Sequence, residues 1–152
     1  MMNSVKEASK EQKKFDPNNP CLFCYPKPEE IIMETEHALL ISDSFPVSPG
    51  HCLVVPRRHI KTYFECSAEE NQEFHYLILQ AKQHVDKQHA PDGYNIGCNN
   101  GTAAGQSVHH LHIHIIPRYQ GDVENPKGGV RWVIPKNSQY QYNNSAQKAL
   151  KK

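Results

Sequence analysis

The sequence predicts an α+β domain in which an antiparallel sheet packs against one main helix. Short β-rich runs are joined by short turns, and one segment repeats apolar residues at helical spacing. The chain carries no internal repeat. Its 152 residues suit one domain that buries about two-thirds of its unfolded surface. Together these observations favour an α+β fold over a doubly wound α/β fold.

The first strands are expected before the helix. Two β-rich runs, Ile31–Met33 and Ala38–Ile41, are separated by charged, turn-like residues, and this pattern predicts a hairpin. A Pro/Gly loop, FPVSPGH, follows the hairpin. The run Cys52–Pro56 then predicts a buried strand that its proline ends.

The main helix is predicted to begin after Ser67. The stretch SAEE has the pattern of a capping box, with Ser67 as the cap and Glu70 three residues later. Apolar residues then recur at three- and four-residue steps and give the helix one apolar face: Phe74, Leu77, Ile78, Ala81 and Val85. The segment Ala90–Gly93 contains proline and glycine and ends the helix.

Further β-rich runs follow the helix. Tyr94–Cys98 predicts a strand, which is followed by a glycine-rich turn and by a histidine-rich strand that ends at Pro117. Near the end of the chain, VRWVIP (130–135) is another short β-rich run. Residues 1–17 are polar and without periodicity, so we expect a disordered arm there, and residues 137–152 form a polar tail.

Composition excludes several functional classes. The net charge of +1 gives no indication of a nucleic-acid partner, and no window of 18 apolar residues predicts a membrane span. The N-terminal segment lacks the apolar core of a secretion signal. Five cysteines in such a chain indicate reduced thiols or a metal site rather than disulfides. We therefore expect a cytoplasmic protein.

The segment QSVHHLHIHIIPR (106–118) concentrates four histidines in six residues. Side chains alternate between the faces of a strand, so three histidines share one face and three aliphatic residues share the other: His110, His112 and His114 against Leu111, Ile113 and Ile115. The aliphatic face is expected to face the core and the histidine face to be open to a substrate. His109 falls on the aliphatic side and is expected to be a bystander.

Spacing argues against one metal site made by all three histidines. Successive histidines on the face stand about 6.6 Å apart and the outer two about 13 Å apart, so two neighbours could share one zinc ion with bonds near 2.0–2.1 Å but all three could not. Just before them, Gly97, Gly101 and Gly105 recur at four-residue spacing. Such a turn can direct backbone N–H groups toward phosphate oxygens. The loop and the imidazoles together predict an anion pocket that contains a potential nucleophile.

The run His110-Leu-His-Ile-His-Ile-Ile resembles the H-φ-H-φ-H-φ-φ signature of the histidine triad (HIT) superfamily of nucleotide hydrolases and transferases. PGHCLVVPRRH (49–59) and AGQSV (104–108) resemble two further blocks of that family, and CLFC and GGVRWVIP resemble features of its microbial members. The resemblance spans residues 18–136. It implies a five-stranded antiparallel sheet with one main helix per subunit, and a homodimer that extends the sheet.

The resemblance also implies the chemistry. His112 would attack the α-phosphorus of a purine nucleotide or dinucleotide and form a nucleotidyl-histidine that water resolves, while His114 would contact the phosphate. No catalytic metal is required. The remaining positions carried over are Ser107 and Gln106 at the phosphate and leaving group, His51 lining the site, Asp43 at the ribose, and Asn99 and the Gly105 backbone on the phosphate side.

Cys21 and Cys24 form a C-x₂-C pair, which by itself is compatible with a metal site or with two buried thiols. The resemblance implies that His59 and His110 complete a structural zinc site with them. The other three thiols, Cys52, Cys66 and Cys98, are expected to be packing residues.

Four functions remain open at this stage. The leading hypothesis is a hydrolase of dinucleoside polyphosphates such as diadenosine polyphosphates, which GGVRWVIP favours. A purine nucleoside phosphoramidase would use the same His112, and Ser107 in place of threonine favours it. The third is a nucleotide-binding or interaction protein with little turnover. The fourth is a zinc hydrolase that uses the triad as catalytic ligands, which the strand spacing disfavours.

Overall fold

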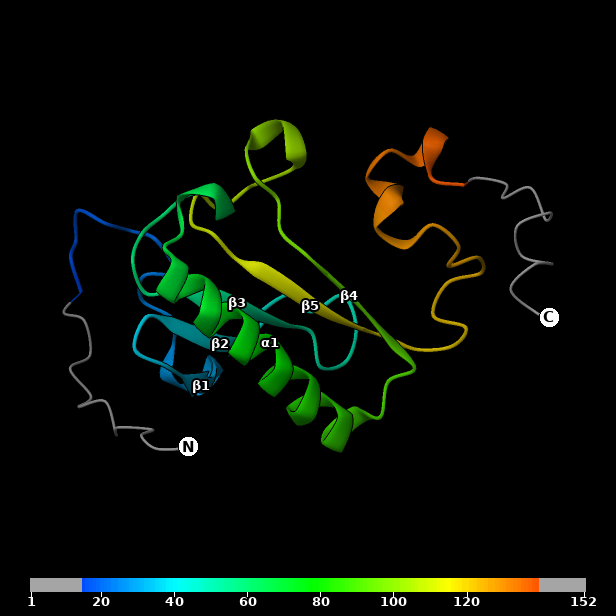
Figure 1. The fold of residues 1–152 in the computed structure, drawn as a ribbon, viewed down its shortest axis with the longest axis horizontal. Helices are drawn as coiled ribbons and strands as arrows, with labels where there is room; N and C mark the ends of the chain where they lie inside the picture. Colours follow the sequence, from blue (N-terminus) through cyan, green and yellow to red (C-terminus); the bar gives the residue numbers. More distant parts are fainter. Residues whose placement is uncertain (1–14, 140–152) are drawn as a thin grey trace. The chain divides into compact units, whose positions relative to one another are not determined.

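The computed structural model describes residues 15–139 and confirms the predicted α+β architecture within them. Five strands form one antiparallel sheet in the order β1-β2-β3-β5-β4, and helix α1 crosses one face of it (Figure 1). The elements are β1 (Ile31–Glu34), β2 (Ala38–Ser42), β3 (Cys52–Pro56), α1 (Ala68–His89), β4 (Gly93–Gly97) and β5 (Ile113–Arg118).

The order of the strands positions the site. Strand β5, the last in the sequence, lies between β3 and β4, so that His114 is paired with Leu53 on one side and Gly97 on the other. Strand β2 lies on the far side of β3. The ends of β2, β3 and β5 are therefore close together although they come from distant parts of the sequence.

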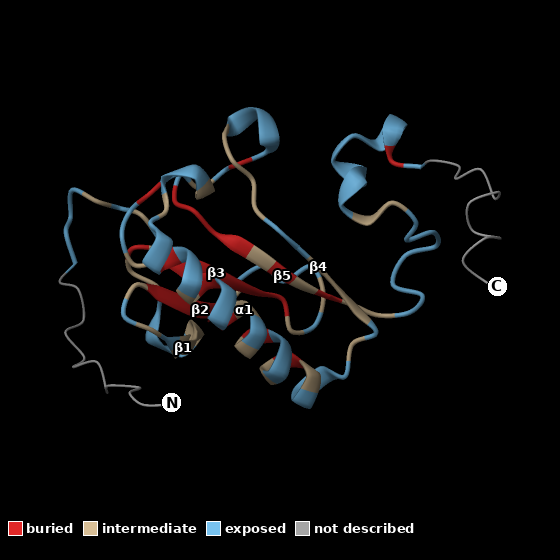
Figure 2. Cartoon of the chain, viewed as in Figure 1, coloured by how far each residue is buried: buried red, intermediate tan, exposed pale blue. Residues whose placement is uncertain are grey.

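The main core lies between the sheet and α1 (Figure 2). Helix residues Phe74, Leu77, Ala81 and Val85 are buried there, as their spacing predicts, and Ile78 packs against them. The aliphatic residues of the histidine segment join the same core from the sheet side: Leu111, Ile113 and Ile115. The predicted alternation of side chains along this segment is therefore confirmed.

A second apolar cluster covers the face of the sheet away from α1. It consists of Leu39, Ile41, Leu53 and Val55, with Phe23 and Ile31 packed against it. This is the face that carries His112 and His114, because they alternate with the residues buried under α1. The histidine face of the sheet is consequently apolar around its imidazoles.

Two expectations about strands were wrong. The paired strand begins only at Ile113, so His110 and His112 lie in the approach to β5. The segment VRWVIP forms the 3₁₀ turns η4 (Gly129–Val133) and η5 (Pro135–Asn137) instead of a strand. The N–H of Arg131 donates to the Gly128 carbonyl in η4, and the N–H of Ser138 donates to the Pro135 carbonyl in η5, so each turn closes locally. A β-rich run forms a strand only where a neighbouring strand pairs with it.

The chain divides into two units, residues 1–119 and 120–152, and the sheet and α1 belong to the first. The predicted disordered arm (1–17) and polar tail (137–152) lie largely outside the described residues, so both stay predictions. Within residues 15–139, no helix is long and apolar enough to cross a membrane.

The predicted capping box at the start of α1 is present. The N–H of Glu70 donates to the Ser67 hydroxyl at 3.1 Å, and the N–H of Ser67 donates to the Glu70 carboxylate at 2.8 Å. We expect Ser67→Ala to lower the free energy of unfolding by about 1 kcal/mol, because one N–H of the first turn loses its acceptor. Urea denaturation would measure the change. Ser67→Thr retains the hydroxyl and is the control, and equal losses in the two variants would contradict a capping role.

Candidate functional site

Three neighbouring strands deliver four predicted site residues to one place. Asp43 follows the end of β2, His51 precedes β3, His112 precedes β5 and His114 is the second residue of β5. The N–H of Asp43 donates to the carbonyl of His51 at 3.1 Å, which continues the pairing of β2 and β3 up to the site. The ring centroids of His112 and His114 are 5.1 Å apart, and those of His114 and His51 are 5.2 Å apart.

His112 is held in one orientation by its own backbone. Its Nδ1 lies 2.8 Å from the carbonyl oxygen of His110. Because a carbonyl oxygen can only accept, Nδ1 carries the proton and Nε2 keeps a free lone pair. Phe23 packs against the ring with centroids 4.9 Å apart. His112 therefore presents a preoriented ring nitrogen beside a hydrophobic wall.

The expectation that the histidine face is open was wrong in part. His110 is fully buried, and only 7% of His112 is exposed. The N-terminal segment around CLFC (21–24) covers this face, since Phe23 contacts the rings of both His110 and His112. His109, the expected bystander, is exposed.

The next pair of imidazoles is His51 on the approach to β3 and His114 in β5. The Nε2 of His51 is 3.0 Å from Nδ1 of His114 and 3.4 Å from a carboxylate oxygen of Asp43. Burial, followed by the neighbouring His112 and His51, lowers the pKa of His114 to about 4. Burial also lowers the pKa of His51, although the Asp43 carboxylate opposes this. Both rings are therefore neutral at pH 7.

The depressed pKa of His114 makes folding depend on pH. Between its ordinary pKa of 6.5 and the folded value of about 4, the unfolded chain binds a proton at His114 that the folded chain does not. We expect the free energy of unfolding to be fully retained above pH 6.5 and to decline as the pH falls toward 4. Urea denaturation at several pH values measures the slope. His114→Gln should flatten it, and an unchanged slope in that variant would refute the assignment.

The other four predicted site residues lie between β4 and β5. This segment starts beside the triad, because Gly97 pairs with His114. Gly105 adopts φ +89, a conformation open to glycine. In the present conformation its N–H donates to Thr102 at 2.9 Å, so binding of phosphate by this amide requires the turn to open. Asn99 is half-buried and Ser107 is exposed.

Gln106 is buried and holds this segment in place. Its carboxamide oxygen accepts from Gly101 N–H at 2.8 Å, and its amide donates to the Lys61 carbonyl at 2.7 Å. Both ends of the side chain are thus engaged within the protein. Here Gln106 supports the glycine-rich loop, and its contact with substrate stays a prediction.

The four predicted metal ligands lie together. The Nδ1 of His110 is 3.4 Å from Cys21 Sγ, 3.5 Å from Cys24 Sγ and 3.2 Å from His59 Nδ1. Cys24 Sγ is 3.3 Å from His59 Nδ1. A tetrahedral zinc ion with Zn–N near 2.0 Å and Zn–S near 2.3 Å separates its donor atoms by about 3.3–3.8 Å. The donor set and its spacing therefore fit zinc.

A backbone carbonyl sets the protonation of His110 so that this histidine can bind a metal. The Nε2 of His110 lies 2.8 Å from the carbonyl of Pro56, so it carries the proton and Nδ1 is free to bind. The N–H of Leu111 donates to Ile60 at 2.7 Å and ties the two histidine segments together. His110 serves two sites, since its side chain belongs to the metal cluster and its carbonyl orients His112.

The thiols outside the cluster are packing residues, as predicted. Cys52 is buried in the main core, and Cys66 and Cys98 pack against it. Burial raises the pKa of the Cys52 thiol to about 12, which leaves it protonated and unreactive at neutral pH.

Sequence reasoning missed three contributors to the site. Phe23 lies between the two cysteines of CLFC, which were predicted to share a metal with His110, so its position near the histidines could have been inferred from the motif. The carbonyl of Pro56 and the N–H of Val47, which lies 3.2 Å from Nδ1 of His51, act through the backbone. Backbone groups have no sequence signature, so these contacts appear only in the structure.

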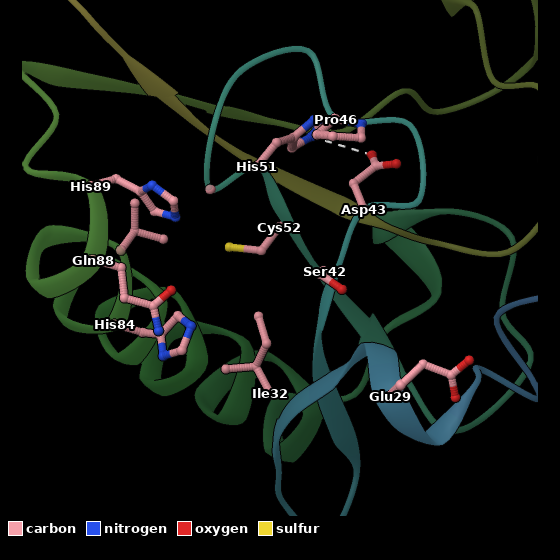
Figure 3. A pocket seen from close by; sticks show the side chains of 12 residues that line it. Glu29, Ile32, Ser42, Asp43, Pro46, His51, Cys52, His84, Gln88 and His89 are labelled. Atoms are coloured by element: carbon pink, nitrogen blue, oxygen red, sulfur yellow. Dashed lines mark ion pairs between the residues drawn. The ribbon is translucent and has the colours of Figure 1, made fainter.

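A pocket reaches the Asp43–His51 pair from the side of the sheet that α1 covers (Figure 3). Asp43 and His51 face each other at one end, and residues of α1 form the opposite wall: His84, Gln88 and His89. Ile32, Ser42 and Cys52 lie between them.

Known proteins resemble this chain in both sequence and fold. A family model described as the HIT domain matches residues 26–121. An uncharacterised HIT-like protein of Methanocaldococcus jannaschii is 43% identical over 115 residues, which cover 72% of this chain and 87% of that protein. The AP-4-A phosphorylase of Mycobacterium tuberculosis is 31% identical over 119 residues, which cover 72% of this chain and 61% of that protein.

Solved structures give the same result. The crystal structure of a Zn-bound histidine triad family protein from Mycobacterium smegmatis matches with a TM-score of 0.62 at 32% identity. The match covers 70% of this chain and 80% of that one. A sheet of five antiparallel strands with one main helix is thus found in a protein whose sequence is also similar.

Proposed function

Since this chain belongs to the HIT domain family, we propose that it cleaves nucleotides at the α-phosphate through a covalent nucleotidyl-histidine on His112. The observation that carries this proposal is the 2.8 Å contact between Nδ1 of His112 and the carbonyl of His110. It leaves Nε2 unprotonated, and a neutral imidazole nitrogen is nucleophilic near pH 7 without a separate base.

The reaction has two in-line steps. In the first, Nε2 of His112 forms a bond to the α-phosphorus, and the bond from phosphorus to the leaving group breaks. The positive charge that develops on the ring is stabilised at Nδ1–H by the His110 carbonyl. In the second, a water molecule forms its O–P bond and releases a proton to solvent while the P–N bond breaks, which returns the bonding electrons to Nε2 and restores the neutral imidazole.

The remaining predicted residues have roles in binding. We assign His114 to the phosphate, His51 to the lining of the site and Asp43 to the ribose hydroxyls. Asn99 and the Gly105 backbone would bind on the phosphate side, and Gln106 and Ser107 would stabilise the phosphate and the leaving group. The buried, paired position of Gln106 makes its contribution indirect, through the glycine-rich loop.

The proposed substrates are dinucleoside polyphosphates of the diadenosine type. The similarity to an AP-4-A phosphorylase supports this class. A purine nucleoside phosphoramidase activity is the alternative, because His112 could equally displace an amine from phosphorus, and Ser107 favours it. A binding or interaction role with little turnover is the third candidate. The preoriented Nε2 of His112 argues against this role, because a protein that only binds nucleotides needs no nucleophile.

We further propose a structural zinc held by Cys21, Cys24, His59 and His110. The ion would supply a cross-link between the N-terminal segment and the residues before β5, and no chemical step passes through it. The fit of the four donor atoms to a tetrahedron supports this assignment. A homodimer with a continuous sheet, also implied by the family, is proposed on that basis alone.

The test compares kcat/KM for diadenosine polyphosphates and for an adenosine phosphoramidate. Each reaction is run with and without inorganic phosphate, because water and phosphate give different products from the same intermediate. A second assay quenches the reaction in acid with substrate labelled at the α-phosphate. We expect label on the protein and faster turnover of the dinucleotides.

Each outcome of this test discriminates between the candidates. Faster turnover of the phosphoramidate would favour the alternative enzyme. Absence of both label and turnover would favour the binding role and would overturn the proposed function.

A further inference from the structure

A backbone amide sets the protonation of His51. The N–H of Val47 lies 3.2 Å from Nδ1 of His51. An amide nitrogen can only donate, so Nδ1 must be the accepting nitrogen of the ring. A neutral imidazole with an unprotonated Nδ1 carries its proton on Nε2. His51 is neutral because burial lowers its pKa.

The proton on His51 then determines the state of His114. Nε2 of His51 lies 3.0 Å from Nδ1 of His114, so Nδ1 of His114 accepts. The carboxylate of Asp43 is a second, more distant acceptor at 3.4 Å. Neutral His114 with an accepting Nδ1 carries its own proton on Nε2, the nitrogen left for substrate.

We propose that His51 is a positioning residue: the chain of donors from Val47 N–H through His51 to His114 holds His114 with a proton on Nε2, as a hydrogen-bond donor to the substrate phosphate. This inference rests on the proposed function. With the opposite tautomer, His114 would present a lone pair to the phosphate oxygens and repel them. The chain of donors therefore makes His114 suited to bind an anion.

The loop that carries Val47 is fastened at several points. The Ser48 hydroxyl donates to Pro117 at 2.6 Å, and the Tyr119 hydroxyl donates to Pro49 at 2.6 Å. Both acceptors are backbone carbonyls, so the loop is tied to the end of β5, the strand that carries His114. These two bonds hold the loop that carries Val47 against the end of β5.

Gly50 lets the same loop lie against α1. It adopts φ +85, and a Cβ there would come within 2.8 Å of His89 and 2.9 Å of Val85. Only glycine combines this conformation with so close an approach. The position of His51, the next residue, depends on it.

A metal ion is the competing explanation for this cluster. The donor atoms of Asp43, His51 and His114 all lie within 4.8 Å of one another. A metal needs an unprotonated Nε2 on His51, which would place the proton on Nδ1, against the Val47 N–H. His110 in the zinc cluster shows the opposite arrangement, because a carbonyl holds its distal proton and frees the ligating nitrogen. The Val47 amide thus favours a hydrogen-bond chain over a metal.

The first test is the ¹⁵N NMR of the histidine rings in the full chain at neutral pH without substrate. The ring nitrogens of a neutral imidazole have distinct shifts for the protonated and unprotonated positions. We expect His51 and His114 both to be protonated at Nε2. Protonation at Nδ1 of either ring, or a positively charged His51, would overturn the proposal.

The second test compares two amides at position 51. In His51→Gln the amide nitrogen reaches the place of Nε2 and can still donate to His114, whereas in His51→Asn it reaches only the place of Nδ1. We expect His51→Asn to lower kcat about 10- to 100-fold with a smaller change in KM, and His51→Gln to recover most of the loss. His114 should lose its single tautomer only in His51→Asn.

These outcomes separate the inference from the proposed function. Equal kcat in the two variants, or an unchanged His114 spectrum in His51→Asn, would refute the positioning role. If the wild type turns over no nucleotide, the proposed function fails, and the NMR spectra still decide whether the donor chain exists.

Discussion

His112→Ala is expected to abolish the covalent intermediate and to lower kcat about 10⁴-fold or more, as loss of a nucleophile does in other enzymes. The contact of Nδ1 with the His110 carbonyl holds the proton on Nδ1 and leaves the lone pair on Nε2, and this lone pair is the proposed nucleophile. Alanine supplies no nucleophile, so the residual rate comes from binding alone. Acid-quenched reactions with α-phosphate-labelled substrate and steady-state kinetics measure the two effects.

His109→Ala is the matched control for this experiment. It removes a neighbouring imidazole that is exposed and that the alternation of side chains places apart from the triad. We expect it to retain both the label and the rate. Label on His112→Ala would show that another group is the nucleophile, and an equal loss in both variants would indicate damage to the fold of this segment.

Cys24→Ser is expected to remove zinc from the purified protein and to lower Tm by more than about 10 °C. Cys24 is the buried thiol of the cluster, and its Sγ contacts a nitrogen of both His59 and His110. The site joins residues far apart in the sequence, so it does not exist in the unfolded chain. Zinc bound at this cluster would therefore contribute directly to the free energy of folding. Elemental analysis and thermal unfolding measure the two quantities.

Cys66→Ser is the control, because this thiol packs against the core outside the cluster. It should retain zinc and shift Tm much less. A wild-type protein purified under reducing conditions without zinc, together with an unchanged Tm in Cys24→Ser, would refute the structural zinc. Since His110 also orients His112, we expect loss of the metal to reduce turnover as a secondary effect.

Much of the fold could be predicted because it rests on local patterns. The capping box at Ser67 and the apolar spacing along α1 set that helix, and two runs with a charged turn between them set the β1–β2 hairpin. The strand predicted for VRWVIP was wrong because β propensity gives a strand only beside a partner strand, and this segment closes its own turns instead. Strands are therefore harder to predict from local patterns than the helix is, because each strand depends on a partner elsewhere in the chain.

Alternation along the histidine segment could be predicted from the amino-acid pattern, and the burial of Leu111, Ile113 and Ile115 in the main core agrees with it. The sequence by itself also determined that two cysteines are spaced for a metal. The tertiary structure alone decided that His110 is buried beneath the N-terminal segment, that Phe23 walls His112, and that the Val47 amide sets the protonation of His51. Tautomers depend on which backbone group lies within hydrogen-bonding distance of a ring nitrogen. Contacts at that scale between distant segments have no pattern in the sequence.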